Sequence, residues 1–210
     1  MQRALTDITL VVDRSGSMNA IREDAEGGIN AFIREQAEQP GEALLTLVQF
    51  DTDYEFVHKA RPLKEVPPYQ LIPRGLTAML DAVGRAIGEA KERTTKQPAQ
   101  ERPGLVIFVV MTDGLENSSR EFSKSQVREL IDQQQREHEW QFLFLGANQD
   151  AFQEAGALGI DPDGISPISA KLARQAYRSS STAVARMRAQ RAAGQKVKGE
   201  FTKEERQQME

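Results

Sequence analysis

The stretch LTDITLVVDRSGSMNAI, residues 5–21, decides the fold expected of this chain. Its first half is typical of a buried strand, and the strand ends in Asp13, Ser15 and Ser17, just before a helical pattern begins. These oxygens therefore belong to a loop at the carboxyl end of a strand. In an open parallel sheet, ligands bind in the crevice beyond that edge. The stretch thus predicts both an α/β fold and the edge at which function would lie.

Strand and helix patterns alternate along the rest of the chain. The strand candidates are Leu5 to Val12, Ala43 to Phe50, Tyr54 to Lys59, Leu105 to Met111 and Gln141 to Leu145, with a weaker one at Gly164 to Ile168. The runs LVIFVVM (105–111) and FLFLG (142–146) lack polar alternation, which is typical of strands buried on both faces of a parallel sheet. We therefore expect these two strands at the centre.

Apolar residues recur with the helical period between these strands. The three segments are Ile21 to Ile33, Met79 to Ala90 and Val127 to Ile131. The third has a defined start, because Ser123 and Gln126 form a capping box. Gly27 and Gly28 interrupt the first helix at a cost of about 1 kcal/mol each relative to alanine. That cost predicts close packing on the sheet at this point.

The order of elements predicts a three-layer α/β sandwich, with a central, mostly parallel sheet and helices on both faces. The segment VQFDTDYEFV (48–57) has the pattern of a hairpin and predicts one antiparallel edge strand. Asp51 and Asp53 lie in its turn, where we expect them to be solvated.

Composition and charge limit the function classes. The chain has 210 residues, of which 39% are hydrophobic and 28% charged, which suits one soluble domain. It has no cysteine, which excludes disulfides, thiolate metal sites and a cysteine nucleophile. The longest apolar run is far shorter than the roughly 20 residues of a membrane span. The N-terminal residues show no signal-peptide pattern, so we expect a cytoplasmic protein.

The last part of the chain is basic. Eight Lys or Arg residues and no acid lie between Ser166 and Gly199, whereas the net charge of the whole chain is −4. We expect one domain over residues 1–190, whose final basic helix, about 168–191, packs on the acidic body. Residues 192–210 have little apolar content and predict a flexible tail. The alternative is a phosphate-contacting arm, for which Tyr177 is the one aromatic that could stack on a base.

Two further loops bring oxygen atoms to the edge reached by Asp13, Ser15 and Ser17. The loop PRGLTAMLDA (73–82) delivers Thr77, and VVMTDGLENSS (109–119) delivers Asp113. Carboxylates and hydroxyls are the hard oxygen ligands that Mg²⁺ or Mn²⁺ prefers, and no His or Cys accompanies them to favour zinc. Taken singly, each of these residues could instead be a helix cap or a turn residue. Their joint occurrence favours a metal site.

The motif DRSGS (13–17), the Thr77 loop and TDG (112–114) together resemble the metal-ion-dependent adhesion site (MIDAS) of von Willebrand factor A (vWA) domains. The resemblance covers about the first 165 residues and implies a Rossmann-like vWA fold. The absence of a signal pattern and of cysteines makes the chain more similar to intracellular bacterial or phage members than to secreted adhesins.

The resemblance also implies a role for each site residue. Ser15, Ser17 and Thr77 would coordinate Mg²⁺ or Mn²⁺ by their hydroxyls, and Asp13 and Asp113 would hold coordinated waters. One position on the ion would stay open for an Asp or Glu of a partner. The expected function is therefore a metal-dependent protein-binding module without catalytic residues, and not an enzyme.

Two other function classes remain open from the sequence. A Mg²⁺-dependent hydrolase or phosphotransferase could use the same ligands. The first loop lacks a second aspartate at DxD spacing, however, and the chain lacks a GxxxxGK[ST] phosphate loop and a general base in an evident position. A nucleic-acid binder acting through the basic helix would show a strongly salt-dependent affinity.

Overall fold

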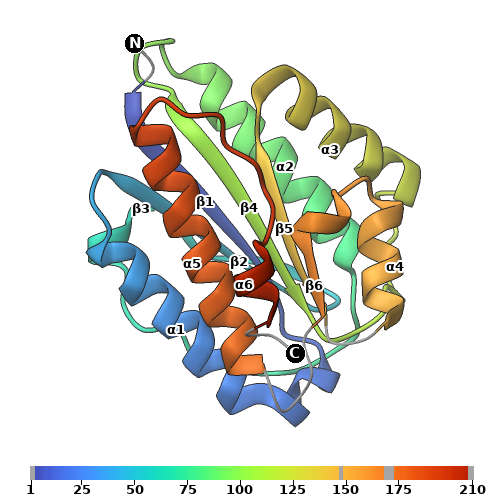
Figure 1. Ribbon diagram of the computed structural model, residues 1–210. Coiled ribbons are helices and arrows are strands. Elements are labelled where there is room, and N and C mark those ends of the chain that lie inside the picture. Colours follow the sequence, from blue (N-terminus) through green and yellow to red (C-terminus); the bar gives the residue numbers. More distant parts are fainter. Residues whose placement is uncertain (1–2, 147–148, 168–172, 208–210) are drawn as a thin grey trace.

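Six strands of the computed structural model, which describes residues 3–146, 149–167 and 173–207, form one sheet in the order β3-β2-β1-β4-β5-β6 (Figure 1). The strands are β1 (Arg3–Asp13), β2 (Ala43–Phe50), β3 (Tyr54–Pro62), β4 (Pro103–Thr112), β5 (Gln141–Gly146) and β6 (Ile165–Pro167). All neighbours pair in parallel except β2 and β3, which are antiparallel. The predicted α/β architecture, with one antiparallel edge strand, is confirmed.

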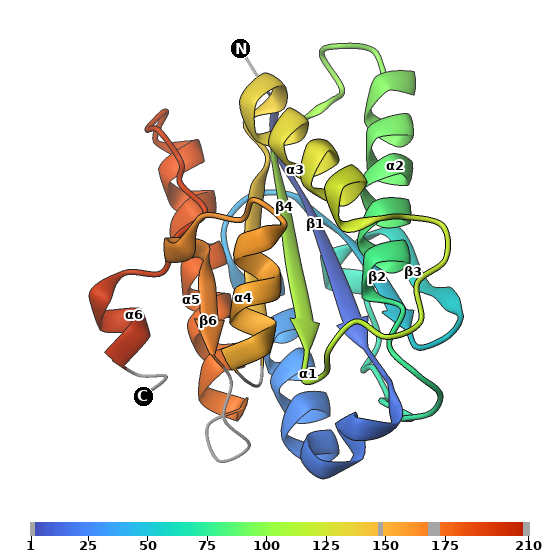
Figure 2. The ribbon, with the colours of Figure 1, turned by 90° about the vertical axis from the view of Figure 1, so that its right-hand side faces the viewer.

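Helices cover both faces of the sheet (Figure 2). They are α1 (Arg22–Glu38), α2 (Met79–Lys96), α3 (Lys124–His138), α4 (Gln149–Ala157), α5 (Ala173–Ala192) and α6 (Lys203–Gln207), with short 3-10 segments at Gly16–Ile21, Leu63–Glu65 and Pro162–Gly164. Helices α1 and α5 share one apolar core with the sheet, and α2, α3 and α4 share the other. We did not predict α4 and α6, because nine and five residues are too few for a clear apolar period. Within the described residues, no helix is long and apolar enough to span a bilayer.

The central strands are buried on both faces, as their composition predicts. In β4 the odd-numbered residues from Leu105 to Met111 belong to the core with α1 and α5, whereas the even-numbered residues from Val106 to Val110 belong to the core with α2 and α3. This division follows from the two-residue period of a strand.

The strand order reverses its direction at β1. From β1 the chain moves outward to β2 and β3, and it then returns across the sheet to β4 on the other side of β1. Strands β1 and β4 run parallel, with Val12 opposite Met111, so the loops that follow them leave the same edge (Figure 2). This is the topological switch point at which open α/β sheets bind ligands.

The capping box at α3 is present as predicted. Ser123 N donates to Gln126 Oε1 at 2.8 Å, and Gln126 N donates to Ser123 Oγ at 3.4 Å. Phe122, just before it, packs over Gly84 of α2, where an added Cβ would lie 2.6 Å from the phenyl ring. The start of α3 is therefore held both by its cap and by α2.

The glycine pair in α1 packs differently from our expectation. Gly28 faces Tyr177 of α5, not the sheet, and a Cβ at this position would lie 2.5 Å from Cγ and Cδ2 of the tyrosine. Gly27 is exposed, and a Cβ there would meet no atom within 4 Å. Only Gly28 is needed for packing, because α5 lies directly against α1.

The final basic helix packs on the body, and several of its cations have partners there. Arg174 pairs with Asp24 at 3.2 Å, and Arg191 pairs with Glu139 at 3.3 Å. Arg188 is buried and donates to the carbonyl oxygen of Gln36 at 2.7 Å, near the end of α1. Tyr177 is only 1% exposed. It is therefore not available to stack on a base, which removes the aromatic on which the phosphate-contacting alternative relied.

The segment after α5 corrects the expectation of a flexible tail within its described part. Val197 and Phe201 are buried in the core shared by α1 and α5. Glu205 of α6 is buried too, pairs with Arg186 at 3.2 Å and accepts a hydrogen bond from Thr202 N at 2.7 Å. Two apolar anchors and one buried ion pair suffice to hold this segment, although its overall composition is polar.

Candidate metal centre

Asp13 is the last residue of β1, and both of its carboxylate oxygens are fixed. Ser15 N donates to Oδ1 at 2.6 Å, and the hydroxyl of Thr112, at the end of β4, donates to Oδ2 at 2.6 Å. The parallel pairing of β1 with β4 brings Thr112 to this position. Asp13 and Ser15 are both buried, so the first loop starts from a rigid base.

The first loop and the loop after β4 are joined directly. The hydroxyl of Ser17 donates to Asp113 Oδ1 at 2.7 Å, and the hydroxyls of Ser15 and Ser17 lie 3.0 Å apart. Ser17 is exposed and Asp113 is half-buried, whereas Ser15 is buried. These side chains therefore form a row of oxygens that leads from the interior to the surface.

Thr77 completes the group from the third loop. A methyl group on Gly114 would lie 3.2 Å from Thr77 Oγ1, 3.5 Å from Ser17 Oγ and 3.8 Å from Asp13 Oδ2. Oxygens from different loops thus face the same point, and the absence of a side chain at Gly114 keeps the space between them open. The structure brings together all five residues that the sequence singles out.

Residues that we did not single out hold the loop after β4 against α2. Asn117 accepts a hydrogen bond from Thr77 N at 2.9 Å, and its own N–H donates to the carbonyl oxygen of Thr77 at 3.0 Å. The carboxylate of Glu116 accepts from Leu80 N, in the first turn of α2, at 2.8 Å. Asp81 accepts from three successive backbone N–H groups, those of residues 120–122. The local sequence carries no signal for these contacts, because Glu116 and Asn117 lie 36 and 40 residues from the groups that they bind.

Asp51 corrects the expectation of a solvated hairpin residue. It is 1% exposed, and its Oδ2 accepts from Arg14 Nε at 2.8 Å and from Arg74 Nε at 2.7 Å. Its carbonyl oxygen accepts from Ala78 N at 2.9 Å. Asp53, by contrast, is exposed as expected. Asp51 therefore also holds the Thr77 loop, through Arg74 and Ala78.

The charges around Asp51 explain its ionisation. Burial alone would raise the pKa of this carboxyl. The hydrogen bond from Asp53 N and the guanidinium groups of Arg74 and Arg14 outweigh that effect, so the pKa lies below its ordinary value. Asp51 is thus a charged structural residue at neutral pH.

The two carboxylates of the candidate site ionise less readily than usual. Burial raises the pKa of Asp13 to about 6, although the hydrogen bonds from Thr112 and Ser15 lower it. The negative charge of Asp113 raises this pKa further. Burial also raises the pKa of Asp113, against the hydrogen bond from Ser17. A cation between them would stabilise both charged forms, and this donor set fits a divalent ion for that reason.

The donor types indicate which ions would suit the site. Within the described residues, no group of three or more His, Cys, Asp or Glu side chains is placed to hold a metal. An ion at the candidate site would therefore depend on hydroxyls as well as on Asp13 and Asp113. All of these donors are hard oxygens, which suit Mg²⁺ or Mn²⁺ better than zinc.

The metal-free protein should lose stability as the pH rises from about 4 to about 6. The pKa of Asp13 is about 6 in the folded protein and 3.8 in the reference state, so the folded chain binds the proton more tightly. By linkage, protonated Asp13 stabilises the folded protein, and the free energy of unfolding falls by about 3 kcal/mol as Asp13 ionises. Urea unfolding in EDTA at several pH values checks this, with Asp13→Asn as the matched variant. The same pH dependence in both proteins would contradict it.

The sequence matches no protein-family model and no curated protein, but solved structures are similar to the chain. Von Willebrand factor type A from Catenulispora acidiphila is similar with 15% identity and a TM-score of 0.55, over 86% of this chain and 42% of that one. The chain has the fold of a von Willebrand factor A domain.

Two other structures share this vWA fold. Proximal thread matrix protein 1 from the mussel byssus is 12% identical, with a TM-score of 0.61, over 90% of this chain and 49% of that one. The manganese-loaded TRAP protein of Plasmodium vivax is 16% identical, with a TM-score of 0.56, over 83% of this chain and 72% of that one. The vWA-fold chain thus spans about half the length of the mussel protein. At these identities the likeness is one of fold.

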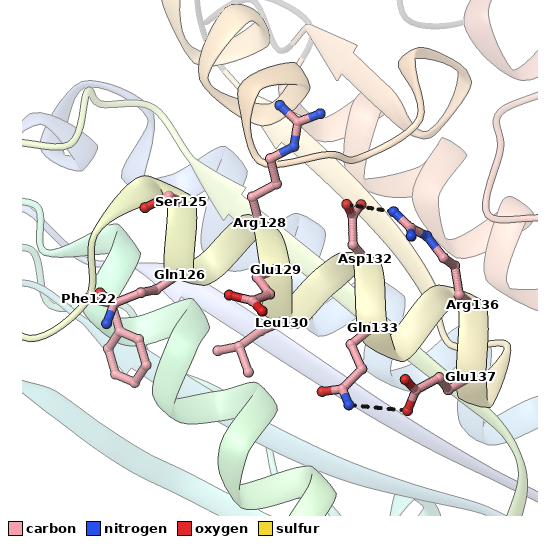
Figure 3. A pocket seen from close by; sticks show the side chains of 10 residues that line it. All are labelled: Phe122, Ser125, Gln126, Arg128, Glu129, Leu130, Asp132, Gln133, Arg136 and Glu137. Carbon is pink, nitrogen blue, oxygen red and sulfur yellow. Dashed lines mark hydrogen bonds and ion pairs between the residues drawn. The ribbon is translucent and has the colours of Figure 1, made fainter.

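A separate hollow lies on the vWA fold, away from the candidate metal centre. A groove of about 700 Å³ runs along the outer side of α3, and Figure 3 shows its lining between Phe122 and Glu137. Its polar side chains pair with each other, as in the ion pair of Asp132 with Arg136 at 3.0 Å. They do not converge on one point as the oxygens around Gly114 do, so the groove offers no comparable chemistry.

Proposed function

We propose that this domain binds Mg²⁺ or Mn²⁺ at the candidate metal centre and uses the ion to bind an Asp or Glu of a partner protein. Ser15, Ser17 and Thr77 would supply hydroxyl ligands, while Asp13 and Asp113 would hold the ion's waters. The observation that carries this proposal is the meeting of three loops, in which Ser17 Oγ lies 2.7 Å from Asp113 Oδ1 and Thr77 Oγ1 faces the same point.

The charge balance favours an acidic partner residue. Hydroxyl ligands add no charge, so two carboxylates roughly neutralise a divalent ion and leave it able to attract a third. Mg²⁺ prefers six oxygen ligands and retains water readily, so a partner carboxylate could replace a water. Without the ion, Asp13 and Asp113 would repel that carboxylate. Recognition should therefore depend on the metal.

The comparisons support a binding role in general terms. Similar folds occur in the manganese-loaded TRAP protein of Plasmodium vivax and in proximal thread matrix protein 1 of the mussel byssus. We infer an interaction module from the fold and a metal-dependent one from the oxygen cluster. A bacterial or phage origin and a cytoplasmic location stay predictions from the sequence.

The hydrolase alternative has less support from the geometry. The cations nearest to the site in the sequence are Arg14 and Arg74, and both are engaged with Asp51. An arginine is a poor general base because its guanidinium group stays protonated in proteins. Release of phosphate from simple phosphomonoesters in Mg²⁺ would be the result that favours this alternative.

Affinity capture tests the proposed function. The domain is immobilised in Mg²⁺, exposed to a lysate, and eluted with EDTA, with Asp113→Ala as the matched bait. Proteins retained by the wild type should elute with EDTA and should be missing from the variant. Converting the contacting Asp or Glu of a captured protein to Asn or Gln should abolish its binding. Retention that withstands EDTA, Asp113→Ala and the partner substitution would contradict the proposal.

A further inference from the structure

Three large apolar side chains are exposed in the described part of the chain, and all three lie on loops of the candidate metal centre. Ile72 is 59% exposed, Leu76 54% and Leu115 43%. Leu76 directly precedes Thr77, and Leu115 follows Gly114. Single exposed apolar residues are common on protein surfaces. Their confinement to the loops around one site is not explained by chance exposure.

The loop that carries Ile72 and Leu76 is anchored beside the first loop. Arg74 N donates to the carbonyl oxygen of Arg14 at 2.7 Å, and Gly16 N donates to that of Gly75 at 3.2 Å. Leu76 N donates to the hydroxyl of Thr52 at 3.2 Å. Gly75 has a φ of +70°, which turns the chain just before Leu76. The backbone is therefore fixed with the leucine at the surface.

Leu115 lies on the loop after β4, and the backbone is held near Thr77 on both sides of this residue. Asn117, two residues after it, pairs with Thr77 at 2.9 and 3.0 Å, and a methyl group on Gly114, just before it, would lie 3.2 Å from Thr77 Oγ1. Leu76 and Leu115 thus flank the site oxygens on two loops. Neither leucine belongs to the two apolar cores of the fold, so packing does not account for them.

A carboxylate and Mg²⁺ are both strongly hydrated, so their contact alone gives weak binding in water. Apolar contacts around such a pair add affinity by burying surface, and they strengthen the electrostatic attraction by excluding water. An exposed apolar group beside a polar centre is typical of a protein-binding surface. Ile72, Leu76 and Leu115 supply the apolar contact area that the ion itself would lack.

We propose that Ile72, Leu76 and Leu115 form an apolar rim, and that the partner is an extended protein segment with large apolar side chains beside its Asp or Glu. In an extended chain, residues two positions apart point to the same side. The preferred motif is therefore an acidic residue with Leu, Ile, Phe or Met two positions before or after it. This inference rests on the proposed function.

A peptide library with a fixed central Asp and random neighbours tests the rim. Peptides retained by the domain in Mg²⁺ should be enriched in large apolar residues two positions from the Asp. A defined probe, Gly-Leu-Ser-Asp-Ser-Leu-Gly, should bind more tightly than the peptide with Ser in place of both Leu residues. Leu76→Ser and Leu115→Ser should each weaken the Leu probe about five- to tenfold and leave Mg²⁺ affinity unchanged. Leu130→Ser, on the half-buried side of α3, is the control and should not change binding.

The outcomes separate the rim from the proposed function. Peptides that require Asp and Mg²⁺ but show no apolar preference, with unchanged binding in Leu76→Ser, would overturn the rim and leave the metal-dependent function standing. Retention of no peptide in Mg²⁺ would overturn the proposed function and the rim with it. Retention of apolar peptides equally well in EDTA would also overturn the inference. Sedimentation of the wild type and Leu76→Ser would then show whether the leucines contact a second copy of the chain.

Discussion

Replacing Asp113 by alanine should weaken Mg²⁺ and Mn²⁺ binding by about 10- to 100-fold, because one of only two carboxylates at the site is removed. The fold should persist. Asp113 is half-buried, and burial raises its pKa, so the charged side chain costs stability in the metal-free protein. The free energy of unfolding in EDTA should therefore stay level or rise slightly. Titration calorimetry measures the first effect, and urea unfolding the second.

Asp53→Asn is the matched control for charge. Asp53 lies on the neighbouring β2–β3 hairpin and is exposed, and its carboxylate pairs with Arg74 at 3.3 Å. The substitution removes one negative charge from the same sheet edge without removing a site oxygen. Ion affinity should stay within about twofold, because an exposed charge is screened by water and salt. Equal losses in both variants would show that general electrostatics, and not a bound ion, explain the effect.

Gly28→Ala should destabilise the protein by about 1–3 kcal/mol, because the added methyl group overlaps Tyr177. The atoms that it would meet, Cβ, Cγ and Cδ2, lie close to the tyrosine backbone. They cannot swing away as the end of a flexible side chain could, so α1 and α5 must separate. Thermal or urea unfolding measures this, and for a chain of this size each kcal/mol shifts Tm by roughly 2–4 °C.

Gly27→Ala is the neighbouring control with the opposite expected sign. Its methyl group would meet no atom within 4 Å, and alanine has a higher helix propensity than glycine. The variant should gain about 0.5–1 kcal/mol. If both variants gain stability, α5 does not pack on Gly28 as the structure shows.

The sequence predicts the central strands well, and the five candidate site residues lie close together as the order of elements predicts, because local patterns carry that information. Continuous apolar runs identify β4 and β5, and β2 was predicted with the bounds Ala43–Phe50 that it has. The loops with Asp13 and Asp113 are predicted at one edge because parallel strands end on the same side, and Thr77 is predicted there because it lies in the loop just before a helix that leads back along the sheet. That prediction needed only the order of the elements.

The residues that hold the site together were not predictable in this way. Asp51 has the pattern of a turn residue, and its burial depends on Arg14 and Arg74, which lie 37 and 23 residues away. Glu116 and Asn117 act through their contacts with the start of α2, 36 and 40 residues away. No local periodicity encodes such partners.

The sequence by itself determined the α/β class, the parallel order of strand and helix, and which oxygen-bearing side chains lie in the loops at the sheet edge, because side-chain periodicity and residue type are local properties. Only the tertiary structure decided that Gly28 meets Tyr177, that Asp51 is buried, and that Leu76 and Leu115 are left at the surface beside the site oxygens. These features depend on which distant segments come into contact. Burial and the ionisation that follows from it are properties of the folded surroundings, not of the residue.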